Sequence, residues 1–152
     1  MGKSLTRDGR PAEVLLIDDS RGDAMLAERA VRDAPFEANL AVARTGEDAL
    51  ARLKDTAHRL PDLILLDMGL PRMSGMDVLT AIKADPELKA IPVIVMSNSG
   101  APDNVARAYN LYAAAYIVKP VSLDAYREAI ALIGQFFFTL ALLTDKVRAG
   151  GL

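Results

Sequence analysis

Short apolar runs alternate with stretches of helical periodicity along most of the chain. Five runs of four or five residues are rich in Val, Ile and Leu and are typical of buried strands. Apolar residues in the intervening stretches recur every three or four positions, which predicts a helix after each strand. The predicted strands are 13–17, 39–43, 62–66, 92–96 and 115–118, and the predicted helices are 20–34, 46–57, 75–84, 102–112 and a long helix from about residue 122.

This alternation predicts an α/β fold, with one parallel sheet covered by helices on both faces. Residues that cap helices support several of the predicted starts. Ser20 precedes the first helix, Thr45 and Asp48 resemble a capping box at the second, and Ser122 opens the last.

The composition fits one globular domain. The chain has 152 residues, of which 51% are hydrophobic and 25% charged. A net charge of -2 provides no positive field for nucleic acid, so we expect no nucleic-acid binding. Cysteine is absent, which excludes disulfides, thiolate nucleophiles and Cys-based zinc sites. Residues 1–11 are polar, so we predict a disordered tail instead of a secretory signal, and a cytoplasmic protein.

Polar side chains follow four of the five predicted strands. Asp18 and Asp19 come after the first, Asp67 after the third, Ser97 after the fourth and Lys119 after the fifth. Because the carboxyl ends of parallel strands lie along one edge, we expect these side chains to meet in one crevice. The three carboxylates suit a hard divalent cation such as Mg²⁺.

These residue types fit phosphoryl transfer to a carboxylate. Asp67 is the best nucleophile candidate, since it ends a buried strand at a Gly/Pro-rich loop. A bound cation would offset the repulsion between carboxylates and an incoming phosphoryl group. Lys119 and the Ser97 hydroxyl could bind phosphoryl oxygens. The expected product is an aspartyl phosphate on Asp67.

Four ordered motifs lie at these strand ends. They are Val14-Leu15-Leu16-Ile17-Asp18-Asp19, Leu63-Ile64-Leu65-Leu66-Asp67-Met68-Gly69-Leu70-Pro71, Val93-Ile94-Val95-Met96-Ser97 and Tyr116-Ile117-Val118-Lys119-Pro120. The sequence from residue 12 to about 136 thereby resembles the receiver domains of two-component response regulators, of which the chemotaxis protein CheY is the prototype. The resemblance implies a doubly wound, flavodoxin-like (βα)5 fold with strand order 2-1-3-4-5.

The resemblance also implies roles for individual residues. It makes Asp67 the phosphoacceptor of a signalling domain that acts on itself, with possible self-dephosphorylation, and is no turnover enzyme. The implied Mg²⁺ ligands are Asp18, Asp19, Asp67 and the backbone carbonyl of Gly69. The residues implied to act on the phosphoryl group or to switch conformation are Lys119, Ser97 and Tyr116, with a cis bond between Lys119 and Pro120.

A narrower resemblance concerns partners. Arg72-Met73-Ser74-Gly75-Met76, Ile91-Pro92 and the tract from 113 to 120 resemble single-domain regulators that pair with bacterial phytochromes and related sensor histidine kinases. The donor histidine would belong to that kinase, because the position of His58, the only histidine, favours a solvated side chain. Two departures are Gly69, where a polar residue is common, and Ser97-Asn98, where threonine and a small residue are common. Serine keeps the hydroxyl, so switching should survive.

Residues 129–143 are unusually apolar. They are too few to cross a bilayer as a helix and too apolar all round for one exposed face. A helix over 122–148 would be roughly 40 Å long and would overhang the domain. We therefore expect residues 137–152 to form an extension that packs on a second copy, giving a homodimer through the last helix. Alternatively, Gly134 or Thr139 marks a break and residues 137–143 fold back or extend as an arm. A membrane-surface helix is disfavoured, because few basic residues flank the segment.

Two other functions compete with the phosphoacceptor. A phosphatase with an aspartyl-phosphate intermediate would need a second aspartate two residues after the nucleophile, where Gly69 stands. A receiver-like dimer module that no longer takes phosphate is opposed by the complete set of acid, hydroxyl and amine groups.

Overall fold

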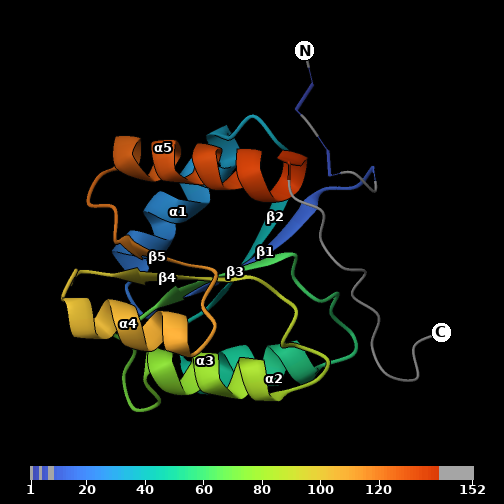
Figure 1. Cartoon of the computed structure of the whole chain (residues 1–152). Helices are drawn as coiled ribbons and strands as arrows, with labels where there is room; N and C mark the ends of the chain where they lie inside the picture. The colour runs from blue at the N-terminus through green and yellow to red at the C-terminus, as the bar shows by residue number, and fades with distance from the viewer. Residues whose placement is uncertain (1, 4, 7–8, 141–152) are drawn as a thin grey trace.

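The computed structural model describes residues 2–3, 5–6 and 9–140, which contain a five-stranded parallel sheet between two layers of helices (Figure 1). The strands are β1 (Ala12–Ile17), β2 (Ala38–Ala43), β3 (Leu63–Asp67), β4 (Val93–Ser97) and β5 (Ala115–Val118). The helices are α1 (Arg21–Asp33), α2 (Gly46–Lys54), α3 (Gly75–Ala84), α4 (Pro102–Asn110) and α5 (Leu123–Gly134), with a π-helical segment η1 (Gln135–Leu140) after α5. The order β2-β1-β3-β4-β5 confirms the predicted fold class and strand order.

Alternate side chains of the central strands enter two separate cores. On β1, Leu15 and Ile17 pack against α2, α3 and α4, whereas Val14 and Leu16 pack against α1 and α5. The same alternation holds on β3 and β4, because successive side chains of a strand point to opposite faces. Both faces are covered, which explains why these strands read as unbroken apolar runs. Each fully buried leucine contributes roughly 1.5–3 kcal/mol to the free energy of folding.

The helix starts carry the predicted cap residues, but at α2 the structure shows only the Thr45 half of the predicted capping box. The side chains of Ser20, Thr45 and Ser122 accept hydrogen bonds from backbone N–H groups in the first turns of α1, α2 and α5, and Ser74 forms a capping box at α3. Such a cap contributes about 1 kcal/mol.

Two helices end two or three residues earlier than predicted. α2 stops at Lys54, because Asp55 accepts the N–H of Ala57 and turns the chain. α4 stops at Asn110, close to Tyr112, whose φ of 68° lies outside the helical region.

The end of α5 packs on its own domain. A Cβ at Gly134 would lie 2.0 Å from the ring of Phe36, so only glycine permits this approach. The same ring packs edge-to-face on Phe138, with 5.2 Å between ring centroids. Phe138 therefore finds its cover within its own chain, although residues beyond 136 were expected to need a partner. The alternative interpretation places a break at Gly134 or Thr139. At Gly134 the α-helix gives way to the π-helical η1, which runs through Thr139, and residues 141–152 of the predicted extension lie outside the described residues.

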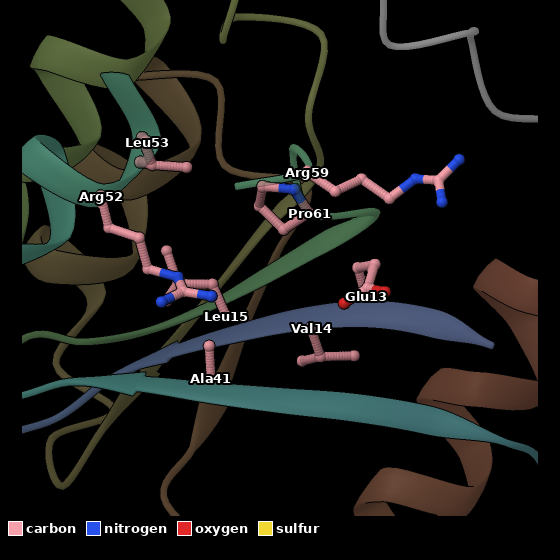
Figure 2. Close-up of a pocket in the computed structure, with 8 residues that line it drawn as sticks. All are labelled: Glu13, Val14, Leu15, Ala41, Arg52, Leu53, Arg59 and Pro61. Carbon is pink, nitrogen blue, oxygen red and sulfur yellow. The ribbon is translucent and has the colours of Figure 1, made fainter. Parts of the chain in front are cut away.

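A small hollow lies toward the amino ends of β1 and β3 (Figure 2). It is lined by Glu13, Val14, Leu15, Ala41, Arg52, Leu53, Arg59 and Pro61. Its volume of about 20 Å³ suits a single water molecule, so we assign it no ligand. In the described part of the chain no helix is both long and apolar enough to cross a bilayer.

Candidate functional site

The carboxyl ends of β1 and β3 bring three acidic side chains together. β1 and β3 are neighbours, but the chain leaves β1 toward β2 on one side and leaves β3 toward β4 on the other. Such a reversal opens a crevice at the carboxyl edge of the sheet. Asp18 and Asp19 follow β1 and Asp67 is the last residue of β3, one residue further along the ladder than predicted. One carboxylate oxygen from each of the three lies within 4.8 Å of the others.

Asp18 is the most buried of these acids, with an exposure of 0%. Its Oδ1 accepts the N–H of Ser20 at 2.9 Å, and its Oδ2 lies 2.9 Å from the Lys119 ammonium. Burial raises the pKa of Asp18 and the charge of Asp67 adds to this, against the opposing effects of Ser20 and Lys119. A cation beside Asp18 would relieve this cost. Asp19 is exposed, and its backbone carbonyl accepts a hydrogen bond from Arg44 at 2.7 Å.

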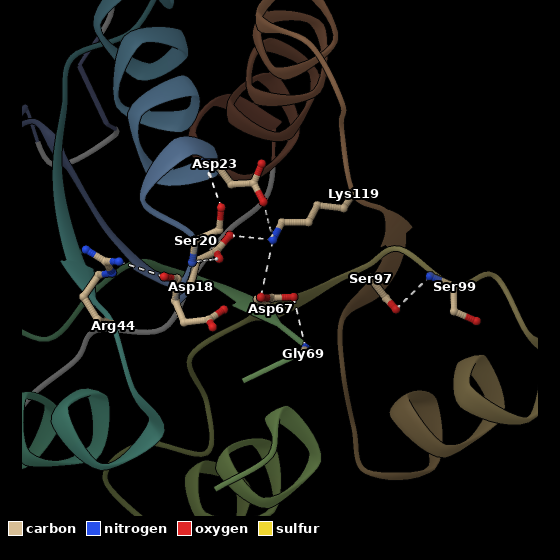
Figure 3. A network of polar contacts seen from close by, with 10 residues as sticks. Asp18, Ser20, Asp23, Arg44, Asp67, Gly69, Ser97, Ser99 and Lys119 are labelled. Atoms are coloured by element: carbon tan, nitrogen blue, oxygen red, sulfur yellow. Dashed lines mark hydrogen bonds and ion pairs between the residues drawn. The ribbon is translucent and has the colours of Figure 1, made fainter. Parts of the chain in front are cut away.

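Lys119 is the centre of the ionic network (Figure 3). Its ammonium lies 2.7 Å from Asp23, 2.9 Å from Asp18 and 3.4 Å from Asp67. The side chain is only 5% exposed. Burial alone would lower the pKa of Lys119, but hydrogen bonds to Asp23 and Asp18 and the charges of Asp18 and Asp67 outweigh it and raise the pKa. The amine is therefore a fixed positive charge beside Asp67.

Asp23 is the member of this network that the sequence did not reveal. It lies in the first turn of α1, where Ser20 caps its N–H. An acid at that position is typical of helix-dipole stabilisation and needs no other role. The available signal was its place in a helix that starts at the same sheet edge as Asp18.

The predicted switch residues Ser97 and Tyr116 meet at Ser99. Ser97 is the last residue of β4, and its hydroxyl accepts the N–H of Ser99 at 3.1 Å (Figure 3). The Tyr116 hydroxyl donates to the carbonyl of Ser99 at 2.6 Å, and its N–H donates to the hydroxyl of Tyr109. The loop after β4 thus joins the two side chains.

Two glycines shape the loop after Asp67. Gly69 donates its N–H to Oδ1 of Asp67 at 3.1 Å. A Cβ at Gly75 would lie 2.7 Å from the carbonyl oxygen of Asp67 and 2.8 Å from the Cα of Met68. Only glycine lets α3 start this close to β3.

One feature implied by the family resemblance is corrected. Every peptide bond in the described residues is trans, including the bond from Lys119 to Pro120. The trans form of an X–Pro bond is favoured by about 0.5–1 kcal/mol. Lys119 reaches its three carboxylates with this bond trans.

The arrangement suits a divalent cation and an incoming phosphoryl group. Oxygen-only ligands from Asp18, Asp19 and Asp67 match the preference of Mg²⁺ and related hard cations. In addition, Oδ2 of Asp18 is buried and lies 2.9 Å from the Lys119 ammonium. Asp67 belongs to this cluster and also lies 3.4 Å from the Lys119 ammonium.

Comparisons with known proteins place this site in a family. Residues 14–131 match the sequence model described as "Response regulator receiver domain". The chain is 35% identical over 130 residues to the probable methanogenesis regulatory protein FilR2 of Methanothrix harundinacea, covering 84% of each chain. It is 32% identical over 137 residues to the response regulator Rcp1 of Synechocystis, covering 88% of this chain and 93% of Rcp1.

Solved structures agree. The phosphorylated cyanobacterial phytochrome response regulator RcpA superimposes with a TM-score of 0.82 at 32% identity, covering 89% of this chain and 99% of RcpA. The Mn²⁺-bound form of Rcp1 superimposes with a TM-score of 0.80 at 32% identity, covering 89% of this chain and all of Rcp1.

Proposed function

Since the chain belongs to the response regulator receiver domain family and has a phosphoacceptor role in two-component signalling, we propose that Asp67 is the residue that takes the phosphoryl group. The observation that carries this choice is the position of Asp67. Its carboxylate lies 3.4 Å from the Lys119 ammonium, and one of its oxygens lies within 4.8 Å of oxygens of Asp18 and Asp19. Positive charge and further oxygen ligands therefore flank one nucleophile.

In the proposed reaction a carboxylate oxygen of Asp67 attacks the phosphorus of a phosphohistidine on a sensor kinase. The O–P bond forms as the P–N bond breaks, and the imidazole leaves with the electron pair and takes a proton from water. Lys119 neutralises one phosphoryl oxygen, and the Ser97 hydroxyl donates to another after leaving Ser99.

The cation we propose is Mg²⁺, held by Asp18, Asp19, Asp67 and the backbone carbonyl of Gly69. When bound, it supplies positive charge that offsets the repulsion between the carboxylates and the phosphoryl group. The oxygen-only ligand set supports this choice. Rcp1, a similar protein, has a Mn²⁺-bound form.

Intact-mass spectrometry after incubation with acetyl phosphate and Mg²⁺ tests both assignments. We expect the wild type to gain the mass of one phosphoryl group, and Asp67→Asn or wild type with EDTA to gain none. Asp103→Asn, which changes an exposed acid in the first turn of α4, should behave as wild type. Uptake by Asp67→Asn would move the acceptor elsewhere, and no uptake by the wild type would refute the proposal. Loss of the added mass over time would measure self-dephosphorylation.

Phosphorylation would reach the surface through the loop after β4. Ser97 and Tyr116 both bond to Ser99, so withdrawal of the Ser97 hydroxyl frees the loop and the tyrosine together. Tyr116 lies on β5 and donates its N–H to Tyr109 of α4, and the side chains of Tyr112 and Val118, close to it in sequence, are exposed. We propose that the signalling surface lies here. NMR chemical-shift changes of these residues on phosphorylation test it, and we expect smaller changes in Ser97→Ala than in the wild type.

The partners we propose are a sensor histidine kinase, such as a bacterial phytochrome, and a second copy of this chain, with the protein in the cytoplasm. The likeness to RcpA supports the phytochrome. For the dimer, Leu132 and Phe136 on the outer side of the last helix are 61% and 54% exposed.

Light scattering tests the dimer. We compare the full chain with Leu132→Gln and with a version ending at Leu140, which keeps the buried Phe138. A dimeric wild type with weaker association in these variants is expected, and a monomeric wild type would contradict the dimer.

A further inference from the structure

Asp23 holds the amine that the phosphoryl group needs. Its carboxylate is 2.7 Å from the Lys119 ammonium, closer than Asp18 at 2.9 Å and Asp67 at 3.4 Å. Figure 3 shows Asp23 reaching this amine from α1, on the side away from Gly69. The ammonium is therefore drawn toward α1 before any phosphoryl group arrives.

Asp23 differs from Asp18 and Asp67, the other two acids near Lys119, because it is not one of the candidate cation ligands. Within the described residues, the acidic cluster able to hold a cation comprises Asp18, Asp19 and Asp67, without Asp23. The Asp23 side chain is also 30% exposed, so it could be solvated without Lys119. Asp23 is not needed to neutralise the buried amine, because the carboxylates of Asp18 and Asp67 already lie close to it.

Resting on the proposed function, we propose that Asp23 is a positioning residue that slows phosphorylation, because its carboxylate competes with the phosphoryl group on Asp67 for the Lys119 ammonium. The competition is electrostatic as well as geometric. The carboxylate oxygens of Asp23 and Asp67 both contact one nitrogen and are therefore at most about 6 Å apart. Phosphorylation adds negative charge beside Asp67, within close range of Asp23.

Tyr126 offers an alternative partner for Asp23. This residue lies in α5, which packs on α1, and it is 1% exposed. Its hydroxyl has no hydrogen-bond partner among the described residues. Burial raises its pKa, and the negative charge of Asp23 adds to this rise. A protonated hydroxyl can donate to the Asp23 carboxylate when Lys119 turns to the phosphoryl group.

The test compares rates of phosphate uptake from acetyl phosphate with Mg²⁺ in wild type, Asp23→Asn, Asp23→Ser and Asp23→Glu. The matched control is Asp48→Asn. Asp48 occupies the same position in α2 that Asp23 occupies in α1, and Thr45 caps its N–H at 3.0 Å. The substitution Asp48→Asn therefore removes one negative charge, as Asp23→Asn does, but at a residue that does not contact Lys119.

We expect Asp23→Asn and Asp23→Ser to raise the rate about tenfold, after allowance for the screening of a partly exposed charge. Their affinity for beryllofluoride with Mg²⁺, measured by calorimetry, should rise by a similar factor. Asp23→Glu should return both quantities toward wild type, and Asp48→Asn should stay within about twofold of wild type.

Several results would overturn the proposal. They are an unchanged or slower rate in both neutral variants, or an equal acceleration in Asp48→Asn. A wild type that takes no phosphate would instead refute the proposed function, so the two failures are distinguishable.

Discussion

Replacing Gly134 by alanine should destabilise the protein, although alanine is the better helix former. An ideal Cβ at this position lies 2.0, 2.5 and 2.6 Å from three ring atoms of Phe36. Carbon atoms prefer separations of about 3.5–4.0 Å, so the ring must move by roughly 1.5 Å. Phe138 packs against that ring, and both are buried, which leaves little room for the shift.

The expected magnitude follows from two opposing terms. Overpacking a core costs about 1–3 kcal/mol, and a clash this short belongs at the upper end. The gain in helix propensity from glycine to alanine is about 1 kcal/mol. The net loss in the free energy of unfolding is therefore about 2 kcal/mol, or a fall of roughly 4–8 °C in Tm for a chain of this length.

Urea unfolding followed by far-UV circular dichroism measures this change. Gly22→Ala is the matched control, because Gly22 is in α1 and a Cβ there meets nothing within 4 Å. We expect that variant to gain about 0.5–1 kcal/mol. Replacing the ring by the smaller leucine side chain, in Gly134→Ala/Phe36→Leu, should recover part of the lost free energy of unfolding. A Gly134→Ala protein at least as stable as the wild type would refute the reasoning.

Three further changes test other contacts. Asp62→Ala should cost about 2 kcal/mol in urea unfolding, because this buried carboxylate accepts two hydrogen bonds from Arg10 and one from the N–H of Glu13. Arg127→Met should lower the unfolding midpoint at pH 7. The Arg127 hydrogen bond lowers the pKa of Asp33, so its stabilising effect is present above the unfolded pKa of about 3.9 and is lost as the pH falls through the folded pKa. The wild type and the variant should therefore converge in midpoint below pH of about 4, and a constant gap would contradict the ion pair. Tyr126→Phe should raise the free energy of unfolding by up to about 1 kcal/mol, since it removes a buried hydroxyl that lacks a partner among the described residues, and a marked loss would show that the hydroxyl is bonded.

The sequence predicted the strand-end residues because their convergence depends only on parallel strands. Once β1, β3, β4 and β5 are recognised, the positions of Asp18, Asp67, Ser97 and Lys119 along one edge follow from topology. The strand order itself came from the family resemblance. Local caps were also predictable, because they involve residues three apart.

Contacts between side chains of different layers were not predictable in the same way. Asp23 reads as an ordinary first-turn acid until Lys119 is placed beside it. Likewise, the cover of Phe138 depends on a phenylalanine 102 residues earlier and on the absence of a Cβ at Gly134. No periodicity records such a pairing.

The ends of four strands supply the candidate site, and β5 is the last strand to be synthesised. Lys119 follows that strand, about a hundred residues after Asp18 in the chain, so the crevice exists only when the sheet is complete. Contacts between residues so distant in sequence form late, because loop closure must precede them. A molecule that lacks β5 therefore has no assembled site, and incorporation of phosphate reports that β1, β3, β4 and β5 have come together.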